Sequence, residues 1–343
     1  MTAVDPNLHE LWRNAPLASF KEFVESTAFV ELGRRNQAPK TKPENDVDTD
    51  PDVKEAPRPI RESSVKVYLS MFGKYLRWLE HRQLHLLDVK ASDIDAFMEE
   101  RMSGKRGKAR DLSSRSIRKS YLRLLERMYE HLKLVPNPAK DAMFHASKQD
   151  GGLGRDAHLV SLSPEQIAAF MAALPEINDF PKNWKRRRDR AMLCLMLGAG
   201  LRVSEVIGMY IENIGLPNDN GSIRVTVSAA SNDGTSRWHQ TQLRAFAAPD
   251  VLAWVEERKR MDMPDQMLFP ANEKGVRLDK ATLYRQAKKT FARAGIDVAR
   301  HGGRTLRNAF AVNELEGGTP PEEVTEFLGL HKQKSINIYL TRK

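Results

Sequence analysis

Residues 198–206 read Gly-Ala-Gly-Leu-Arg-Val-Ser-Glu-Val, and they follow the apolar run Ala-Met-Leu-Cys-Leu-Met-Leu at 191–197. The pattern predicts that a buried helix stops at glycine, that the chain turns, and that Ser204 caps a second helix. Arg202 would then be held at a turn between two packed helices. A planar guanidinium fixed in this way can donate two parallel hydrogen bonds to a phosphate.

A second arginine-bearing segment lies near the C-terminus. Residues 303–311 read Gly-Arg-Thr-Leu-Arg-Asn-Ala-Phe-Ala, and Phe-Leu-Gly-Leu-His at 327–331 and Ser-Ile-Asn-Ile-Tyr at 335–339 follow. Arg304 and Arg307 are three residues apart, so they would share one face of a helix. Gly329 suits a helix C-terminus, and Ser335 could cap a final turn that presents Tyr339.

Composition narrows the class of partner. The 343 residues suffice for two domains. The 55 Lys and Arg against 45 Asp and Glu give a net charge of +10, which favours a polyanionic partner.

The single cysteine, Cys194, excludes a disulfide framework and is expected to be a small buried hydrophobe. The nine histidines show no metal-ligand spacing, so we expect neither metal nor cofactor. Without a signal peptide or an apolar run of about 18 residues, a cytoplasmic protein with no membrane partner is expected.

Hydrophobic spacing divides the chain. Residues 1–34 form an N-terminal helical segment with one short amphipathic helix, and the polar, Pro-rich residues 35–59 form a linker. A helical domain over 60–148 contains helices that begin near residues 63, 91 and 113. The glycine-rich residues 149–160 form a second linker, and a second domain spans 161–343.

The second domain opens with Ser163-Pro164-Glu165-Gln166, a capping box that begins a helix. Helices dominate it, apart from the strand Ile223–Val227 and a partner strand around Trp238 to Leu243. The predicted fold class is therefore mainly α with a small β-sheet.

A basic stretch in the first domain is a candidate phosphate-binding surface. By itself such a run is more often a solvated loop, but it lies within a helical domain of a basic protein. Together with one arginine of the predicted hairpin, the candidate DNA-binding residues are Lys105, Arg106, Lys108, Arg110, Arg115, Arg118, Lys119 and Arg237.

Three strings resemble the signature boxes of the tyrosine recombinases, or phage integrases. They are Gly-Leu-Arg-Val-Ser-Glu at 200–205, Leu-Arg-x-x-Phe-Ala at 306–311, and a Leu-Gly pair nine to eleven residues before Ile-Tyr. They occur in the family's order and at about its separations. The preceding helical domain also resembles the family's SAM-like core-binding domain, so the resemblance covers nearly everything after residue 60.

The resemblance implies a catalytic domain that forms a clamp around duplex DNA together with the helical domain. Arg202 and Arg307 would hold the scissile phosphate, and Tyr339 would attack it to form a 3′-phosphotyrosyl link without ATP or metal. A homo-oligomer on DNA, from dimer to tetramer and with other recombinase subunits as possible partners, is implied as well. Only four residues follow Tyr339, so assembly would use surfaces other than a C-terminal helix.

The chain departs from the family pattern at three acid/base positions. Arg304 stands where histidine is usual, Leu330 stands where histidine or tryptophan is usual with His331 one step later, and no lysine occurs between Lys185 and Lys259. One interpretation is a catalytically active recombinase of a phage or mobile element that acts at specific DNA sites. In it Arg304 adds charge stabilisation, and His331 or His301 supplies acid/base catalysis. The other is a catalytically impaired homologue that serves as a DNA-binding or assembly subunit. A monomeric nicking-closing topoisomerase would share the arginine and tyrosine chemistry.

Overall fold

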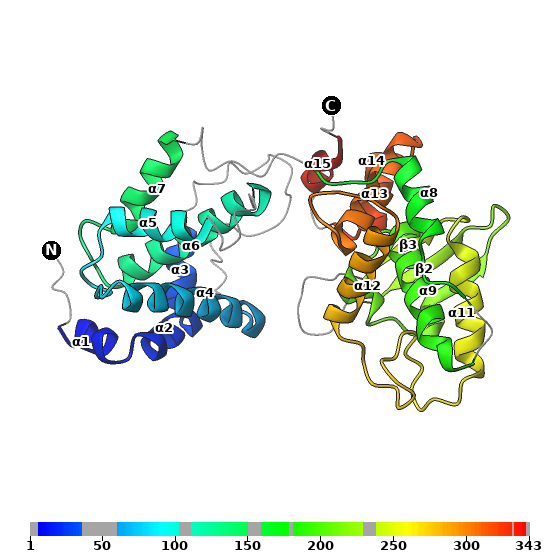
Figure 1. Ribbon diagram of the computed structural model, residues 1–343, viewed down its shortest axis with the longest axis horizontal. Coiled ribbons are helices and arrows are strands. Elements are labelled where there is room, and N and C mark those ends of the chain that lie inside the picture. Colours follow the sequence, from blue (N-terminus) through cyan, green and yellow to red (C-terminus); the bar gives the residue numbers. More distant parts are fainter. Residues whose placement is uncertain are drawn as a thin grey trace, which may run out of the picture. The chain divides into compact units, whose positions relative to one another are not determined.

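The computed structural model describes residues 6–35, 60–102, 111–149, 159–177, 181–228, 238–330 and 333–340. The chain divides into two compact units, Met1–Ala157 and His158–Lys343 (Figure 1). The predicted linker over 35–59 and the glycine-rich stretch 151–154 fall almost entirely outside the described residues. Among the helices within these ranges, none combines the length and apolar character needed to cross a membrane.

Helices are the only regular secondary structure among the described residues of the first unit. Its helices are α1 (Pro6–Asn14), α2 (Pro16–Glu25), α3 (Thr27–Arg35), α4 (Glu62–His81), α5 (Ala91–Met102), α6 (Asp111–His131) and α7 (Pro138–Gln149). The three helix starts predicted near residues 63, 91 and 113 each lie within two residues of an observed one.

The N-terminal segment differs from the prediction, because it forms three helices where one was expected. Proline has no N–H to donate and cannot continue a helix, so Pro16 begins α2. Trp12 and Phe20 are buried in one core with Phe72 of α4, on which the Phe20 ring stacks at 4.0 Å between centroids. The segment is thus part of the helical unit and packs on α4 and α6.

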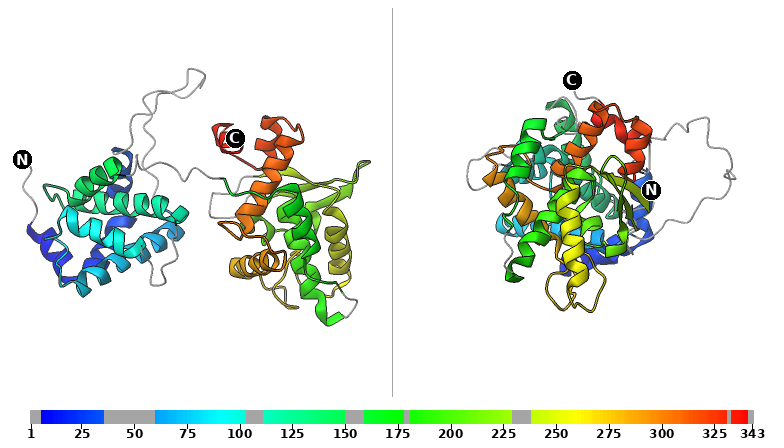
Figure 2. Two further views of the ribbon diagram at one scale, coloured as in Figure 1. Left: turned by 45° about the horizontal axis from the view of Figure 1, so that its top comes forward. Right: turned by 90° about the vertical axis from the view of Figure 1, so that its right-hand side faces the viewer.

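The second unit surrounds the buried helix α9 (Trp184–Gly198), on which α11 (Ala248–Arg260), α12 (Lys280–Arg293) and α13 (Gly303–Glu316) pack (Figure 2). Cys194 lies inside α9 and is fully buried, as predicted, and burial raises the pKa of its thiol. The remaining helices of the described range are α8 (Pro164–Ala172), α10 (Val203–Val206), α14 (Pro321–Phe327) and α15 (Asn337–Leu340).

A small antiparallel sheet completes the second unit, with strand order β1 (Ile214–Pro217), β2 (Ile223–Val227) and β3 (His239–Leu243). Strands β2 and β3 confirm the predicted pair, and Val225 lies opposite Thr241. Strand β1 was not predicted because Ile-Gly-Leu-Pro is short and lacks alternating β-branched residues. The predicted capping box is present: the Gln166 N–H donates to Ser163 Oγ at 3.2 Å, and the Ser163 N–H donates to Gln166 Oε1 at 3.0 Å. The mainly α fold with a small sheet is confirmed.

Candidate active site

Arg202 lies at the turn between α9 and α10, and the turn depends on glycine. Gly200 has a φ of +64°, and a Cβ there would run into the Phe310 ring. Arg202 itself is the N-cap of α10, so the prediction that Ser204 caps this helix is wrong. The Glu205 carboxylate instead accepts the Arg202 backbone N–H at 2.6 Å and its Nη1 at 2.5 Å. One carboxylate therefore holds both the turn and the guanidinium.

Arg307 lies on α13 and is buried, with 7% of its surface exposed. Its Nη1 donates to the Gly200 carbonyl at 2.7 Å, and its Nη2 donates to the Leu328 carbonyl at 2.5 Å. Nη1 also lies 3.7 Å from Glu205 Oε2. Because Glu205 pairs with both arginines, the two guanidinium groups are gathered around one buried carboxylate.

Tyr339 comes to the same cluster from α15, which packs on α13. Its hydroxyl donates to Asn308 Oδ1 at 3.4 Å, and it also interacts with the Arg307 guanidinium. Asn308 is fixed in turn, since its Nδ2 donates to the Val160 carbonyl at 2.9 Å. Ser335 lies inside a 3₁₀ helix, Gln333–Ile336, that precedes α15, instead of capping the final turn. The structure thus brings Arg202, Arg307 and Tyr339 together from three separate segments.

The charges of the cluster are strongly coupled. Burial lowers the pKa of Arg307 to about 10, and the neighbouring Arg202 acts in the same direction, while Glu205 and Tyr339 act against them. Burial alone would raise the pKa of Glu205, but Arg307, Arg202 and the hydrogen bonds from Arg202 together lower it. At neutral pH Arg307 is therefore still protonated and Glu205 is ionised. Two cations against one anion leave a net positive site that suits a singly charged phosphodiester.

The depressed pKa of Glu205 makes a prediction about acid stability. A carboxyl group whose pKa is lower in the folded state stabilises the fold above its unfolded pKa of 4.5, and this contribution is lost as pH falls through the folded value. Thermal unfolding followed from pH 7 to pH 3 should therefore show a steeper loss of stability in the native protein than in Glu205→Gln. Parallel curves for the two proteins would contradict the coupling of Glu205 to the arginines.

The other predicted site residues lie in different surroundings. Arg304, in the first turn of α13, is exposed, whereas Arg307 is buried. The His301 Nε2 lies 3.2 Å from the Ile296 carbonyl, and its ring packs edge-on against Phe291, so this histidine is engaged in the loop before α13. Outside the described residues lie His331, Arg237, Lys105, Arg106, Lys108 and Arg110, together with the side chain of Arg115.

Two candidate DNA-binding residues of the first unit are described, Arg118 and Lys119, and both are half-buried on α6. Arg118 Nη2 lies 4.0 Å from Asp95 Oδ1, and the Asp95 carboxylate also lies 3.3 Å from His145. Part of the Arg118 charge is therefore balanced inside the unit. Among the residues that the structure describes, no group of three or more His, Cys, Asp or Glu is arranged to hold a metal ion.

Three residues of the cluster were not predicted from the sequence, namely Glu205, Asn308 and His239. Glu205 stands three residues after the N-cap, which is the spacing of a capping box, but the cap is Arg202 and not the Ser or Thr that would signal one. Asn308 offers no signal beyond its place next to Arg307. His239 is buried at the start of β3, and its ring packs on Gly329, directly after the carbonyl that accepts Arg307 Nη2. Strand alternation turns His239 inward, but only the tertiary fold places it against Gly329.

Gly329 follows the C-cap of α14, as predicted for a helix C-terminus, and has a φ of +53°. A Cβ at this position would lie 2.5 Å from His239 Nδ1. We expect Gly329→Ala to destabilise the fold by roughly 1–3 kcal/mol, from the backbone strain and the clash together. Adding His239→Ala should restore part of the lost stability, which denaturant unfolding can measure. A double variant no more stable than Gly329→Ala would show that the ring contact is unimportant.

Comparison with solved structures groups the fold with the site-specific recombinases. The XerH recombinase bound to its difH substrate, in a pre-cleavage complex, aligns over 95% of this chain and 94% of its own at 17% identity, with a TM-score of 0.57. A lambda integrase dimer bound to a COC′ core site aligns over 83% of this chain and 74% of its own at 13% identity, with a TM-score of 0.58. At these identities the likeness concerns the fold alone.

The chain belongs to the phage integrase family, whose sequence model matches residues 160–343. Its curated relatives include the tyrosine recombinase XerD of Yersinia pestis, 26% identical over 82% of this chain and 87% of the relative. The XerD of Bifidobacterium longum is 24% identical over 82% and 87% of the two chains. The resemblance to the tyrosine recombinases that the sequence motifs suggested is thus confirmed as membership of that family.

Proposed function

We propose that this chain breaks and rejoins duplex DNA at specific sites through a 3′-phosphotyrosyl intermediate on Tyr339. The observation that carries the proposal is that Arg202 and Arg307 meet at the buried Glu205, with Tyr339 beside Arg307. The similarity to the XerD tyrosine recombinases supports the reaction class, and the XerH and lambda integrase complexes support duplex DNA as the partner.

The proposed reaction exchanges one phosphoester for another. The Tyr339 oxygen attacks the phosphorus and loses its proton, the bond from phosphorus to the 5′-oxygen breaks, and that oxygen gains a proton to leave as a 5′-hydroxyl. Attack by a 5′-hydroxyl of the partner strand reverses these steps and releases Tyr339. The ester bond is kept throughout, so no energy source such as ATP is required.

The two arginines supply electrostatic stabilisation in this scheme. Negative charge develops on the non-bridging phosphate oxygens during attack. Each preorganised donor that faces these oxygens lowers the barrier by roughly 3 kcal/mol. Arg307 is preorganised because its hydrogen bonds to Gly200 and Leu328 fix its plane before DNA binds. Its charge also lies beside the Tyr339 hydroxyl, where negative charge develops as the proton leaves.

Around this site we propose the arrangement suggested by the sequence. The basic stretch at 105–119, Arg118 and Lys119 included, contacts backbone phosphates, and Arg237 contributes from the β2–β3 connection. A homo-oligomer, from dimer to tetramer, assembles on DNA, which the lambda integrase dimer on its core site supports. Membership of the phage integrase family supports a phage or another mobile element as the DNA that is moved.

A second candidate function is a catalytically impaired subunit that binds DNA and assembles with an active recombinase. It is favoured by the residues at the acid/base positions, namely the exposed Arg304 and the half-buried Leu330. The contact of His301 with its own loop, at the Ile296 carbonyl, also favours this second function. Both candidates bind DNA, so only the covalent step separates them.

The test uses a binding site recovered from a random-sequence duplex library by repeated rounds of binding. A duplex with that site and a nick beside the expected cleavage position traps the intermediate, since the short cleaved strand diffuses away and prevents religation. We expect a covalent protein–DNA adduct on a denaturing gel, formed without ATP. Tight and specific binding with no adduct would instead establish the impaired subunit.

A further inference from the structure

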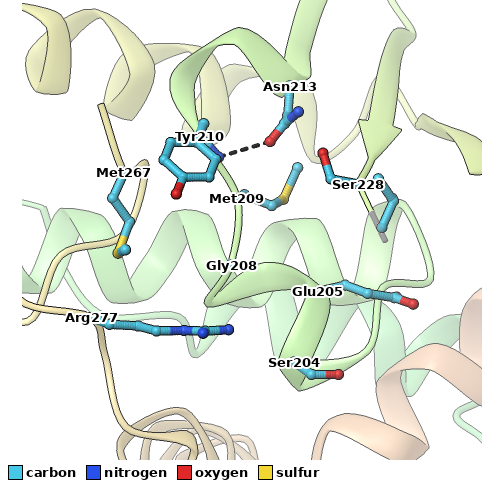
Figure 3. A pocket seen from close by; sticks show the side chains of 10 residues that line it. Ser204, Glu205, Gly208, Met209, Tyr210, Asn213, Ser228, Met267 and Arg277 are labelled. Carbon is cyan, nitrogen blue, oxygen red and sulfur yellow. Dashed lines mark hydrogen bonds between the residues drawn. The ribbon is translucent and has the colours of Figure 1, made fainter. Parts of the chain in front are cut away.

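A pocket of about 260 Å³ opens beside α10 and shares Glu205 with the candidate active site (Figure 3). Its walls come from α10 and the turn that follows, from the end of β2, and from the loop before α12. The polar residues that line it are Ser204, Glu205, Tyr210, Asn213, Ser228 and Arg277.

Arg277 is the cation of this pocket. Gly208 makes room for its guanidinium, since a Cβ on Gly208 would lie 3.3 Å from Arg277 Nη2. Figure 3 shows the side chain extended beneath Gly208 toward Ser204. An isolated bridge between Pro270 and Arg277 anchors the backbone of the loop at this point. The backbone that carries Arg277 is therefore anchored, while its side chain is exposed beside Gly208.

No anion of the described residues balances this charge. Glu205 is the acidic residue in the lining, and it is committed to Arg202 and Arg307. Its carboxylate end points away from Arg277 (Figure 3). The carboxylate of Glu205 therefore offsets charge on Arg202 and Arg307 but not on Arg277. A single phosphodiester on Arg202 and Arg307 would still leave the charge of Arg277 uncompensated.

The chemistry of the pocket fits a second phosphate of the same DNA strand. Successive phosphates of one strand are separated by ~3.4 Å along the helix axis, so a strand that places one phosphate on Arg202 and Arg307 carries further phosphates along the adjoining surface. The forked donors of arginine match phosphate oxygens. The hydroxyl groups of Ser204 and Ser228 lie in the same lining and add donors of the kind that contact phosphates.

We infer that Arg277 is a positioning residue that binds a non-scissile phosphate next to the one attacked by Tyr339, and so fixes the register of the cleaved strand. The inference rests on the proposed function. Arg277 would thus supply a cation from the loop before α12, close to the end of β2, where the lysine-free connection to β3 begins.

The first experiment measures how DNA affinity depends on salt in the native protein, in Arg277→Gln and in Arg260→Gln. Arg260 is a matched control, because it is an exposed arginine of the same unit that lines neither the pocket nor the active site. Loss of one phosphate contact should reduce the slope of log affinity against log salt by about 0.9 in Arg277→Gln. The slope should not change in Arg260→Gln. An unchanged slope in Arg277→Gln would overturn the inference.

The second experiment identifies the phosphate. Neutral methylphosphonates replace, one at a time, the two phosphates that flank the scissile one in the trapping duplex. At one of these positions the methylphosphonate should weaken binding by the native protein roughly tenfold, because it removes the charged hydrogen bond from Arg277. The same methylphosphonate should not weaken binding by Arg277→Gln, because this variant already lacks that bond. Equal losses in the two proteins at both positions would contradict the assignment.

Two controls keep these outcomes distinct. Adduct formation by the native protein tests the proposed function independently of Arg277, so native adduct together with unchanged Arg277→Gln behaviour refutes this inference alone. Thermal unfolding of each variant shows that it is folded. If Arg277→Gln proves unfolded, Arg277→Met, which keeps an aliphatic stem against Gly208, replaces it in both experiments with the same expected results.

Discussion

Tyr339→Phe is expected to abolish the covalent protein–DNA adduct, with a fall in rate of at least roughly 10³-fold. The change removes only the oxygen that would attack phosphorus. The phenyl ring stays against the cluster of Phe310, Val324 and Ile336, on which Tyr339 packs. The hydroxyl donates a long hydrogen bond to Asn308 at 3.4 Å and interacts with Arg307, so its loss should cost about 1 kcal/mol of stability. Adduct yield on the nicked duplex is the measurement.

Tyr284→Phe is the matched control for this change. Tyr284 is an exposed tyrosine on α12 of the same unit, and its ring lies beside Gly302 at the start of α13. The control should form adduct at the native rate, and both variants should bind DNA with native affinity. Undiminished adduct from Tyr339→Phe would mean that the attacking group is a different residue.

Arg307→Ala should abolish the adduct and also destabilise the second unit. The substitution removes a buried cation, leaves the Gly200 and Leu328 carbonyls without this donor, and takes one of two cationic partners from Glu205. Breaking a buried ion pair from one side typically costs roughly 3–5 kcal/mol, and the lower end is expected here because Arg202 remains. DNA affinity should largely persist, since it is spread over many phosphates. Adduct yield, denaturant unfolding and binding are measured together.

Two further variants separate the catalytic part of this effect from the structural part. Arg202→Ala should also abolish the adduct, but with a smaller loss of stability, because the Arg202 side chain is 27% exposed and Glu205 keeps Arg307. Adding Glu205→Gln to Arg307→Ala removes the poorly compensated charge and should restore part of the stability without restoring the adduct. Recovery of cleavage in that double variant would contradict a direct role for Arg307.

The fold followed from the sequence where side-chain patterns are local. Ile223, Val225 and Val227 alternate with polar residues, and these three are the buried positions of β2. The capping box at Ser163 is equally local. Strand β1 exists because it pairs with β2, and nothing in its four residues would specify a strand alone. One helix was predicted at the N-terminus where three are present, because Pro16 was not recognised as the start of a new helix.

The candidate site shows the same division. Motif resemblance selected Arg202, Arg307 and Tyr339, but sequence spacing does not reveal that one carboxylate joins the two arginines. That role of Glu205 depends on contact between α10 and α13, two helices about a hundred residues apart. Asn308 and His239 acquire their positions from similar long-range packing. Arg277 carries no motif at all, and only its place beside Gly208 distinguishes it from other surface arginines.

Identification of the residue that carries the DNA in the trapped adduct tests directly whether Tyr339 is the attacking residue. Digestion of the adduct with nuclease and protease, followed by mass spectrometry, should yield one modified peptide, which contains Tyr339 joined to a 3′-phosphate. A nucleotide found on any other side chain, or a link through a 5′-phosphate, would contradict the central claim that Tyr339 attacks a phosphate held by Arg202 and Arg307.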